Sequence, residues 1–188
     1  MRHKLAIFLS GAGSNARNIL DFFKGNSETE IVVLLSNRPE AGARAIGNDY
    51  GVPVVALTRE NFQGDALLKV LADFDVNFIV LAGFLKKIPS ELTSAFDRRI
   101  VNIHPALLPR FGGKGMYGHY VHEAVVQAGA RESGITVHYV NEHYDEGDII
   151  FQARLEVTPD DTPADVERKV RELEITHYPG VLGSLLSQ

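Results

Sequence analysis

Short apolar runs alternate with helix-like segments along the first half of the chain, and this alternation constrains the fold more than any other feature. The runs are rich in Val, Ile and Leu, as strands buried on both faces usually are. Strands that alternate with helices form a parallel sheet covered by those helices. The predicted strands span residues 5–9, 31–35, 52–56, 78–82 and 100–103, and the predicted helices span residues 15–24, 41–50 and 64–74.

The pattern changes after Pro109. The next stretch, residues 110–118, holds four glycines and no hydrophobic periodicity, which predicts an active-site loop. Two longer strands further on, joined by a polar segment, are typical of an antiparallel pair. The predicted elements of this half are a helix over 119–128, strands over 134–140 and 148–157 joined by 141–147, and a terminal helix over 162–186.

The terminal helix carries its own start signal. Thr162 is a candidate N-cap, Pro163 suits the first helical position, and Asp165 completes a candidate capping box. All these elements together predict one α/β domain over residues 1–188 with a Rossmann-like, mostly parallel central sheet. Helices should cover both faces of that sheet, and a late strand should run antiparallel.

Composition and charge exclude several classes of protein. The chain has no cysteine, which rules out disulfides, thiolate metal sites and cysteine nucleophiles. Its net charge of −5 argues against a nucleic-acid-binding protein. The apolar run after the basic start is too short for a secretory signal, and no stretch approaches the roughly 20 apolar residues of a membrane span. We therefore expect a cytoplasmic protein that binds neither nucleic acid nor membrane.

The strand predicted over 100–103 runs directly into Pro105, which cannot donate to a sheet and should end the strand. Asn102 and His104 are two residues apart, so their side chains should point to the same side. The carboxyl end of a strand is where ligands bind in open α/β sheets. An amide that binds a carbonyl oxygen, next to an imidazole that moves a proton, suits attack by an amine on a carbonyl carbon.

A glycine-rich turn, residues 10–15, follows the first strand and precedes a helix. Gly13 would let the backbone approach an anion, and Ser14 and Asn15 add donors at the helix start, which favours phosphate. The other motifs of the chain favour a phosphate monoester over a dinucleotide. The spacing Gly11-x-Gly13-x-x-Ala16 also fits a loose dinucleotide fingerprint, and Arg38 could then hold the 2′-phosphate of NADP. A tight turn with no ligand is the third possibility.

A carboxylate is needed to orient His104. The polar loop over residues 143–148, which joins the two late strands, supplies the candidates. Spacing alone does not distinguish Asp145, Glu146 and Asp148. A metal site built from His119, His122 and Glu123 is conceivable because the two histidines are three residues apart. The spacing matches no known metal motif, so we expect no metal.

Four sequence motifs together resemble the folate-dependent formyltransferases. They are Gly-Ser-Asn at 13–15, Leu-Ala-Gly-Phe at 81–84, Asn-Ile-His-Pro-Ala-Leu-Leu-Pro at 102–109 and Tyr-Asp-Glu-Gly at 144–147. The resemblance covers nearly the whole chain, and the glycine loop points to the glycinamide ribonucleotide branch of the family. It implies a formyltransferase fold with a phosphate-binding half (about 1–100) and a folate-binding, catalytic half (about 101–188).

The resemblance implies a direct transfer of the formyl group from 10-formyltetrahydrofolate to the amine of 5-phosphoribosylglycinamide, a step in purine synthesis. Asn102 would hold the formyl oxygen, His104 would transfer protons, and Asp145 would orient His104 and stabilise its charged form. His138 would support this centre, and Glu174 would contact the glycinamide. The implied phosphate-binding residues are Gly13, Ser14 and Asn15, and the implied folate-binding residues are Leu85, Lys86, Lys87, Ile88, Asn102, Asn141, Tyr144 and Asp145.

Two departures from the family pattern concern the folate. No segment aligns cleanly with the one that usually carries a folate-contacting arginine, although Arg59 is a possible substitute. Lys86 and Lys87 replace a more apolar stretch and could attract a glutamate tail. The alternatives are another folate-dependent formyltransferase or hydrolase, of the sugar-nucleotide or methionyl-tRNA type, and an NADP-dependent oxidoreductase. We expect a monomer or a homodimer.

Overall fold

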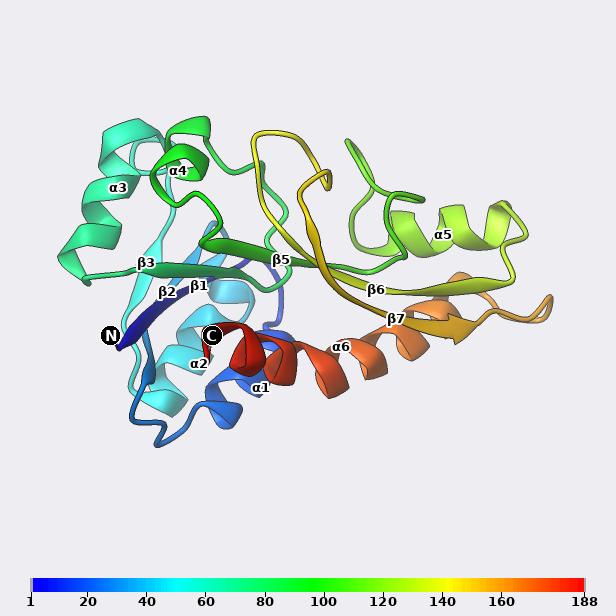
Figure 1. The fold of residues 1–188 in the computed structure, drawn as a ribbon, viewed down its shortest axis with the longest axis horizontal. Helices are drawn as coiled ribbons and strands as arrows, with labels where there is room; N and C mark the ends of the chain where they lie inside the picture. The colour runs from blue at the N-terminus through cyan, green and yellow to red at the C-terminus, as the bar shows by residue number, and fades with distance from the viewer. Residues whose placement is uncertain (1, 188) are drawn as a thin grey trace.

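The computed structural model describes residues 2–187, which form a seven-stranded sheet with helices on both of its faces (Figure 1). The strands lie in the order β3-β2-β1-β4-β5-β6-β7. β1 to β5 are parallel, and β6 runs antiparallel to both of its neighbours. The strands are β1 (His3–Leu9), β2 (Thr29–Ser36), β3 (Val54–Ala56), β4 (Phe78–Leu81), β5 (Ile100–His104), β6 (Glu132–Tyr139) and β7 (Ile149–Glu156).

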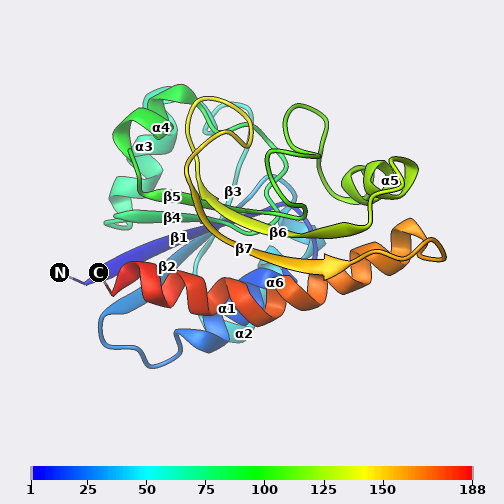
Figure 2. The same cartoon turned by 45° about the vertical axis from the view of Figure 1, so that its right-hand side comes forward.

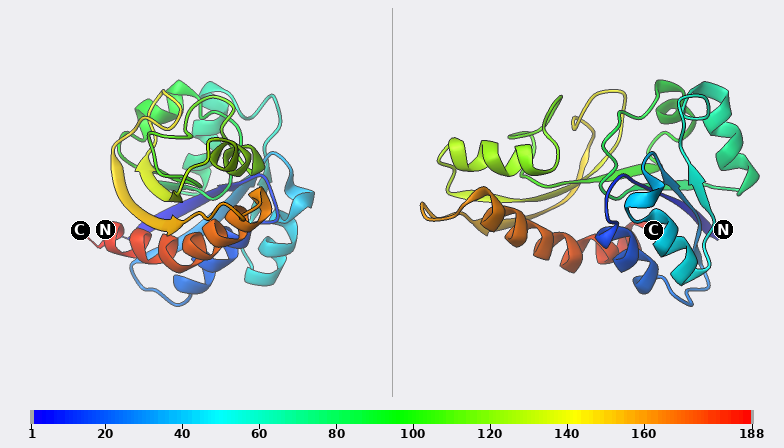
Figure 3. Two further views of the ribbon diagram at one scale, coloured as in Figure 1. Left: turned by 90° about the vertical axis from the view of Figure 1, so that its right-hand side faces the viewer. Right: turned by 180° about the vertical axis from the view of Figure 1, so that it is seen from behind.

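Two apolar cores hold the layers together, one on each face of the sheet. α1, α2 and α6 pack on one face, and α3 and α4 pack on the other. α6 runs along its face beside α1 (Figure 2), while α3 and α5 lie at opposite ends of the molecule (Figure 3). The helices are α1 (Ser14–Phe22), α2 (Ala43–Tyr50), α3 (Gly64–Asp73), α4 (Ser90–Ala95), α5 (His119–Gln127) and α6 (Pro163–Leu186), with a short 3₁₀ turn at Pro39–Ala41.

The predicted α/β class, the mostly parallel sheet and the late antiparallel strand are confirmed. The predicted third strand was too long at its start because Pro53 has no N–H to give to the ladder, so β3 begins at Val54. α4 and the 3₁₀ turn were not predicted, since each is too short for a hydrophobic period to be visible. Among residues 2–187, no helix combines the length and the apolar character needed to cross a membrane.

The sheet reverses its winding direction between β1 and β4, because β2 and β3 extend to one side and β5 to the other. Such a switch point leaves a crevice at the carboxyl ends of the two strands, where ligands bind in open α/β sheets. The glycine-rich turn follows β1, and Gly83 follows β4, at this crevice. Ser10 joins the two segments, because its backbone N–H donates to the Gly83 carbonyl at 3.1 Å and its hydroxyl accepts from the N–H of Leu85 at 3.1 Å.

Helix α6 starts with the predicted capping box, in which Thr162 and Asp165 satisfy each other's backbone N–H groups. The helix continues through Pro179, which has no N–H for the carbonyl of Ile175 four residues earlier. The side chain of Asn18 supplies the missing donor, since its Nδ2 lies 2.6 Å from the Ile175 oxygen. A hydrogen bond from α1 therefore replaces one that the proline removes from α6.

Replacing Asn18 tests this substitution of donors. Asn18→Ala leaves the Ile175 carbonyl without its side-chain donor and should lower the free energy of unfolding by about 1 kcal/mol. In a Pro179→Ala background, residue 179 regains its N–H, so the same change should cost clearly less. Urea denaturation of the four proteins in this double-mutant cycle measures the coupling. Equal costs in both backgrounds would show that Asn18 does not compensate for the proline.

Candidate active site

A cavity of about 680 Å³ opens at the carboxyl ends of the central strands and contains nearly all of the predicted site residues. One wall is the glycine-rich turn with the facing side of α6, and another is the segment after β4. The end of β5, the loop before α5 and the loop between β6 and β7 complete it. The predicted site residues that line it are Gly13, Ser14, Asn15, Leu85, Lys86, Lys87, Ile88, Asn102, His104, His138, Asn141, Tyr144, Asp145 and Glu174.

Position 13 strongly favours glycine in this turn. Its φ of +79° is in the left-handed region, and a Cβ there would lie 2.4 Å from Cδ1 of Ile46 and 2.8 Å from Cδ1 of Leu9. The residue is the N-cap of α1 and makes no side-chain cap, so the helix presents free backbone N–H groups to the cavity. Ser14 is exposed there, and this arrangement suits an anion such as a phosphate.

Asn15 and Glu174 connect the start of α1 to the middle of α6. The Nδ2 of Asn15 donates to Oε2 of Glu174 at 2.8 Å, while the buried Oδ1 of Asn15 has no hydrogen-bond partner among the described residues. Burial raises the pKa of the Glu174 carboxyl, and the bond from Asn15 opposes that rise. The pair therefore offers one half-buried carboxyl group and one free amide oxygen beside the glycine-rich turn, a combination that can bind amide and amine N–H groups.

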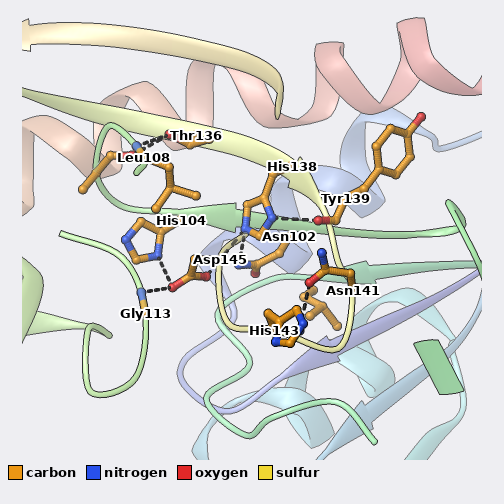
Figure 4. A network of polar contacts seen from close by, with 12 residues as sticks. Asn102, His104, Leu108, Gly113, Thr136, His138, Tyr139, Asn141, His143 and Asp145 are labelled. Atoms are coloured by element: carbon orange, nitrogen blue, oxygen red, sulfur yellow. Dashed lines mark hydrogen bonds and ion pairs between the residues drawn. The ribbon is translucent and has the colours of Figure 1, made fainter. Parts of the chain in front are cut away.

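The antiparallel pairing of β5 with β6 orients Asn102. In the ladder Asn102 lies directly opposite His138, so their side chains share one face of the sheet. His138 donates from Nδ1 to the Tyr139 carbonyl at 2.8 Å, which leaves the lone pair on Nε2 to accept from Nδ2 of Asn102 at 3.2 Å (Figure 4). Burial lowers the pKa of His138 and favours this neutral form. His138 thus orients the amide, and the second N–H of Asn102 remains available.

His104 ends β5, as Pro105 predicts, and its two ring nitrogens have different neighbours. Nε2 lies 2.8 Å from the carbonyl oxygen of Phe111 and must donate to it, since a carbonyl can only accept. Nδ1 faces Oδ2 of Asp145 at 3.6 Å. Burial lowers the pKa of His104, and the Asp145 charge and the Phe111 bond do not fully offset it. The free protein therefore favours a neutral ring with its lone pair on Nδ1, not the charged imidazole that the sequence suggested.

Of the three candidate acids, only Asp145 enters the cavity close to the histidines. Its Oδ1 lies 3.7 Å from Nε2 of His138, and its Oδ2 accepts from the Gly113 N–H at 2.9 Å (Figure 4). Its φ of +56° is one that Asp and Asn adopt more readily than Glu. Glu146 is exposed, and Asp148 pairs with Arg98 at 2.7 Å. Exposure and pairing in the folded chain thus separate acids that spacing could not.

The predicted folate-binding segment forms an exposed edge of the cavity. Leu85, Lys86 and Lys87 are exposed, whereas Ile88 is buried. The Nζ of Lys87 lies 5.6 Å from the ring centre of Tyr144, so the segment after β4 meets the loop between β6 and β7 there. Asn141 stabilises that loop by accepting from the His143 N–H at 2.9 Å (Figure 4). Two apolar side chains, Leu85 and Ile88, and two cations, Lys86 and Lys87, therefore border this part of the cavity.

Several lining residues were missed by the sequence interpretation. Glu167 and Arg171 precede Glu174 by seven and three residues on α6, so a helical face drawn back from Glu174 would have found them. His122 also lines the cavity; it is buried, and burial lowers its pKa.

Some predicted candidates lie outside the cavity. Arg38 and Arg59 are not among the lining residues, and no three His, Asp or Glu side chains within residues 2–187 cluster as a metal site would require.

Comparison with known proteins assigns the chain to a family. Residues 3–182 match the family described as Formyl transferase. A phosphoribosylglycinamide formyltransferase from Haemophilus influenzae is 35% identical over 95% of this chain and 85% of the relative. The chloroplastic phosphoribosylglycinamide formyltransferases of Arabidopsis thaliana and Vigna unguiculata are both 42% identical over all of this chain, which spans 66% and 62% of their lengths.

Solved structures agree with this assignment. A phosphoribosylglycinamide formyltransferase from Anaplasma phagocytophilum superposes with a TM-score of 0.89 at 30% identity, over 100% of this chain and 88% of the other. A glycinamide ribonucleotide transformylase from Geobacillus kaustophilus also gives 0.89, at 32% identity over 99% and 100% of the two chains. From the family match and from relatives aligned over most of their length, the chain belongs to the formyl transferase family.

Proposed function

We propose that this protein transfers the formyl group of 10-formyltetrahydrofolate to the amine of 5-phosphoribosylglycinamide, a reaction of purine biosynthesis. The observation that carries the proposal is the meeting of Asn102, His104 and Asp145 in one cavity with the glycine-rich turn. An amide donor, a neutral imidazole and a carboxylate suit acyl transfer to an amine. The glycine-rich turn gives the same cavity a phosphate site, which favours a phosphorylated amine as the acceptor of the formyl group.

The free N–H of Asn102 stabilises the negative charge that develops on the formyl oxygen when the amine attacks the formyl carbon. The hydrogen bond with His138 supports this role, because it fixes the amide before the substrate arrives. Such a preorganised donor needs no reorientation during the reaction, and losing one typically costs about 100- to 1000-fold in turnover. The tetrahedral intermediate then collapses by breaking the bond between the formyl carbon and N10 of the folate.

His104 accepts the proton that the attacking nitrogen releases, and Nδ1 is the atom that accepts it, since Nε2 already donates to Phe111. The imidazolium so formed faces the Asp145 carboxylate, which stabilises the new charge. The same proton is then available for the departing folate nitrogen. Asp145 therefore stabilises the charged ring after the proton transfer. Its charge also raises the pKa of His104 against the lowering effect of burial, which helps the ring accept the proton.

The other walls bind the two substrates. Gly13, Ser14 and Asn15 bind the phosphate, and Glu174 binds the glycinamide end. The folate lies along Leu85–Ile88 and contacts Asn141 and Tyr144 as well. In this proposal the whole of residues 1–188 acts as one catalytic domain. The cytoplasmic location and the monomeric or homodimeric state remain predictions, and the plant relatives are named as chloroplastic.

The direct test mixes the protein with 5-phosphoribosylglycinamide and a 10-formylfolate analogue and follows loss of the formyl group by absorbance. We expect deformylation only when both compounds are present, with N-formyl ribonucleotide as the product. Release of formate without the ribonucleotide would identify a hydrolase. Transfer to a sugar nucleotide or to methionyl-tRNA in place of the ribonucleotide would identify another branch of the family.

His104→Ala should lower turnover by about 100- to 10,000-fold, because the reaction loses its proton acceptor. Binding of the ribonucleotide, measured by calorimetry, should stay close to that of the unchanged protein, since His104 is separate from the phosphate wall. His119→Ala is a matched control, because this exposed histidine of α5 does not line the cavity. A variant that loses ribonucleotide affinity but keeps turnover would reverse the proposed roles.

The pH profile should report the state of His104. Because burial lowers its pKa, the neutral ring persists below the ordinary histidine value of about 6.5, and kcat/KM should fall only as the pH drops through that lowered pKa. Asp145→Asn removes a charge that raises this pKa, so the acid limb should move to still lower pH while the plateau falls. NMR titration of the His104 ring checks the direction without substrate. An acid limb that moves to higher pH in Asp145→Asn would contradict this account.

A further inference from the structure

Three side chains stand in register across the last three strands, and two of them have no role in the proposed chemistry. His104 of β5 lies directly opposite Thr136 of β6, which lies directly opposite Gln152 of β7. Directly opposed residues of antiparallel strands share a face, so all three point to the same side of the sheet. Thr136 is fully buried. A buried polar side chain needs a hydrogen-bond partner for each of its polar groups.

The hydroxyl of Thr136 uses its full hydrogen-bonding capacity. It donates to the Ala106 carbonyl at 2.7 Å, and it accepts from the Leu108 N–H at 3.0 Å (Figure 4) and from Nε2 of Gln152 at 2.9 Å. A hydroxyl has one donor and two acceptor sites, so none is left over. Gln152 also uses both of its N–H groups, because Nε2 donates to the Leu108 carbonyl at 3.0 Å as well.

These bonds hold the turn that follows His104. Ala106 and Leu108 are bound to β6 and β7 through the two side chains, and the chain then continues to Phe111, whose carbonyl accepts from Nε2 of His104. The turn therefore leaves the sheet at His104, and its Phe111 carbonyl comes back to the imidazole ring of His104. The position of the Phe111 carbonyl depends on the path from Ala106 to Leu108, and that carbonyl determines which ring nitrogen carries the proton.

We infer that Thr136 and Gln152 are positioning residues: by clamping the turn from Ala106 to Leu108, they hold the Phe111 carbonyl against His104 and keep the lone pair of its ring on Nδ1. The kinetic part of this inference rests on the proposed function, whereas the ring geometry does not. Neither side chain lines the cavity, so both act through the turn.

Thr136→Val tests the clamp, because it keeps the shape of the side chain and removes the hydroxyl. We expect kcat for formyl transfer to fall roughly 10- to 100-fold, since a misplacement of about 1 Å can cost about 100-fold. KM for the ribonucleotide should change little, because the phosphate wall does not touch the clamp. Thr136→Ser keeps the hydroxyl and should restore most of kcat. A serine variant as slow as the valine variant would overturn the inference.

Ser133→Ala is the matched control on the same strand. Ser133 is also buried, but its Oγ has no hydrogen-bond partner among the described residues, so removing it breaks no bond. Its kcat should equal that of the unchanged protein. Gln152→Met gives a milder second variant, which loses only the two amide bonds and should lower kcat in the same direction. If Thr136→Val does not fold, the Gln152→Met and Thr136→Ser pair decides the question.

Ring nitrogen NMR of histidine-labelled protein separates this inference from the proposed function. In the unchanged protein, His104 should carry its proton on Nε2 near neutral pH; in Thr136→Val it should become a mixture of the two tautomers. Unchanged His104 signals together with unchanged kcat would overturn the inference. If the unchanged protein transfers no formyl group, the proposed function fails, and the tautomer signals of the variants still decide whether the clamp holds His104.

Discussion

The pairing of β5 with the antiparallel strand β6 is the interaction on which the candidate site depends. It is the first antiparallel pairing in the order of the sheet, and it places Asn102 against His138 and His104 against Thr136. A parallel partner would bond with evenly spaced, slanted hydrogen bonds and would not oppose these residues pairwise in the same way. One change of strand direction thus gives both candidate catalytic side chains a directly opposed neighbour on the same face.

Around this pairing, loops approach the candidate catalytic groups at positions where a side chain would not fit. A Cβ on Gly147 would lie 1.8 Å from the Tyr139 carbonyl oxygen, so the loop that carries Asp145 can return along β6 only with a glycine there. The loop before α5 approaches from the other side and donates the Gly113 N–H to the same carboxylate. Asp145 is consequently held by its own loop and by the Gly113 N–H of the other, which explains how a residue in an irregular segment can have a defined position.

Most of the fold could be predicted from the sequence because its strands are short, doubly buried and separated by clear helix signals. The neighbourhood of Asn102 and His104 could also be predicted, since the period of a strand and the proline after it are local properties. The identity of the acid could not, because the choice among Asp145, Glu146 and Asp148 depends on exposure in the folded chain and on a distant partner, Arg98. The charge state of His104 could not either, since burial is a property of the whole fold and outweighs the local effect of a carboxylate.

The two amides of α1 that reach α6 have a consequence for how the cavity can change shape. Asn15 and Asn18 bond to consecutive residues of α6, Glu174 and Ile175, so the two helices are joined at two points within one helical turn. The glycine-rich turn and the facing side of α6, two walls of the cavity, are therefore connected by side-chain hydrogen bonds. The segments around Gly113 and Tyr144 line the same cavity but belong to neither helix, so this connection does not fix that part of its rim.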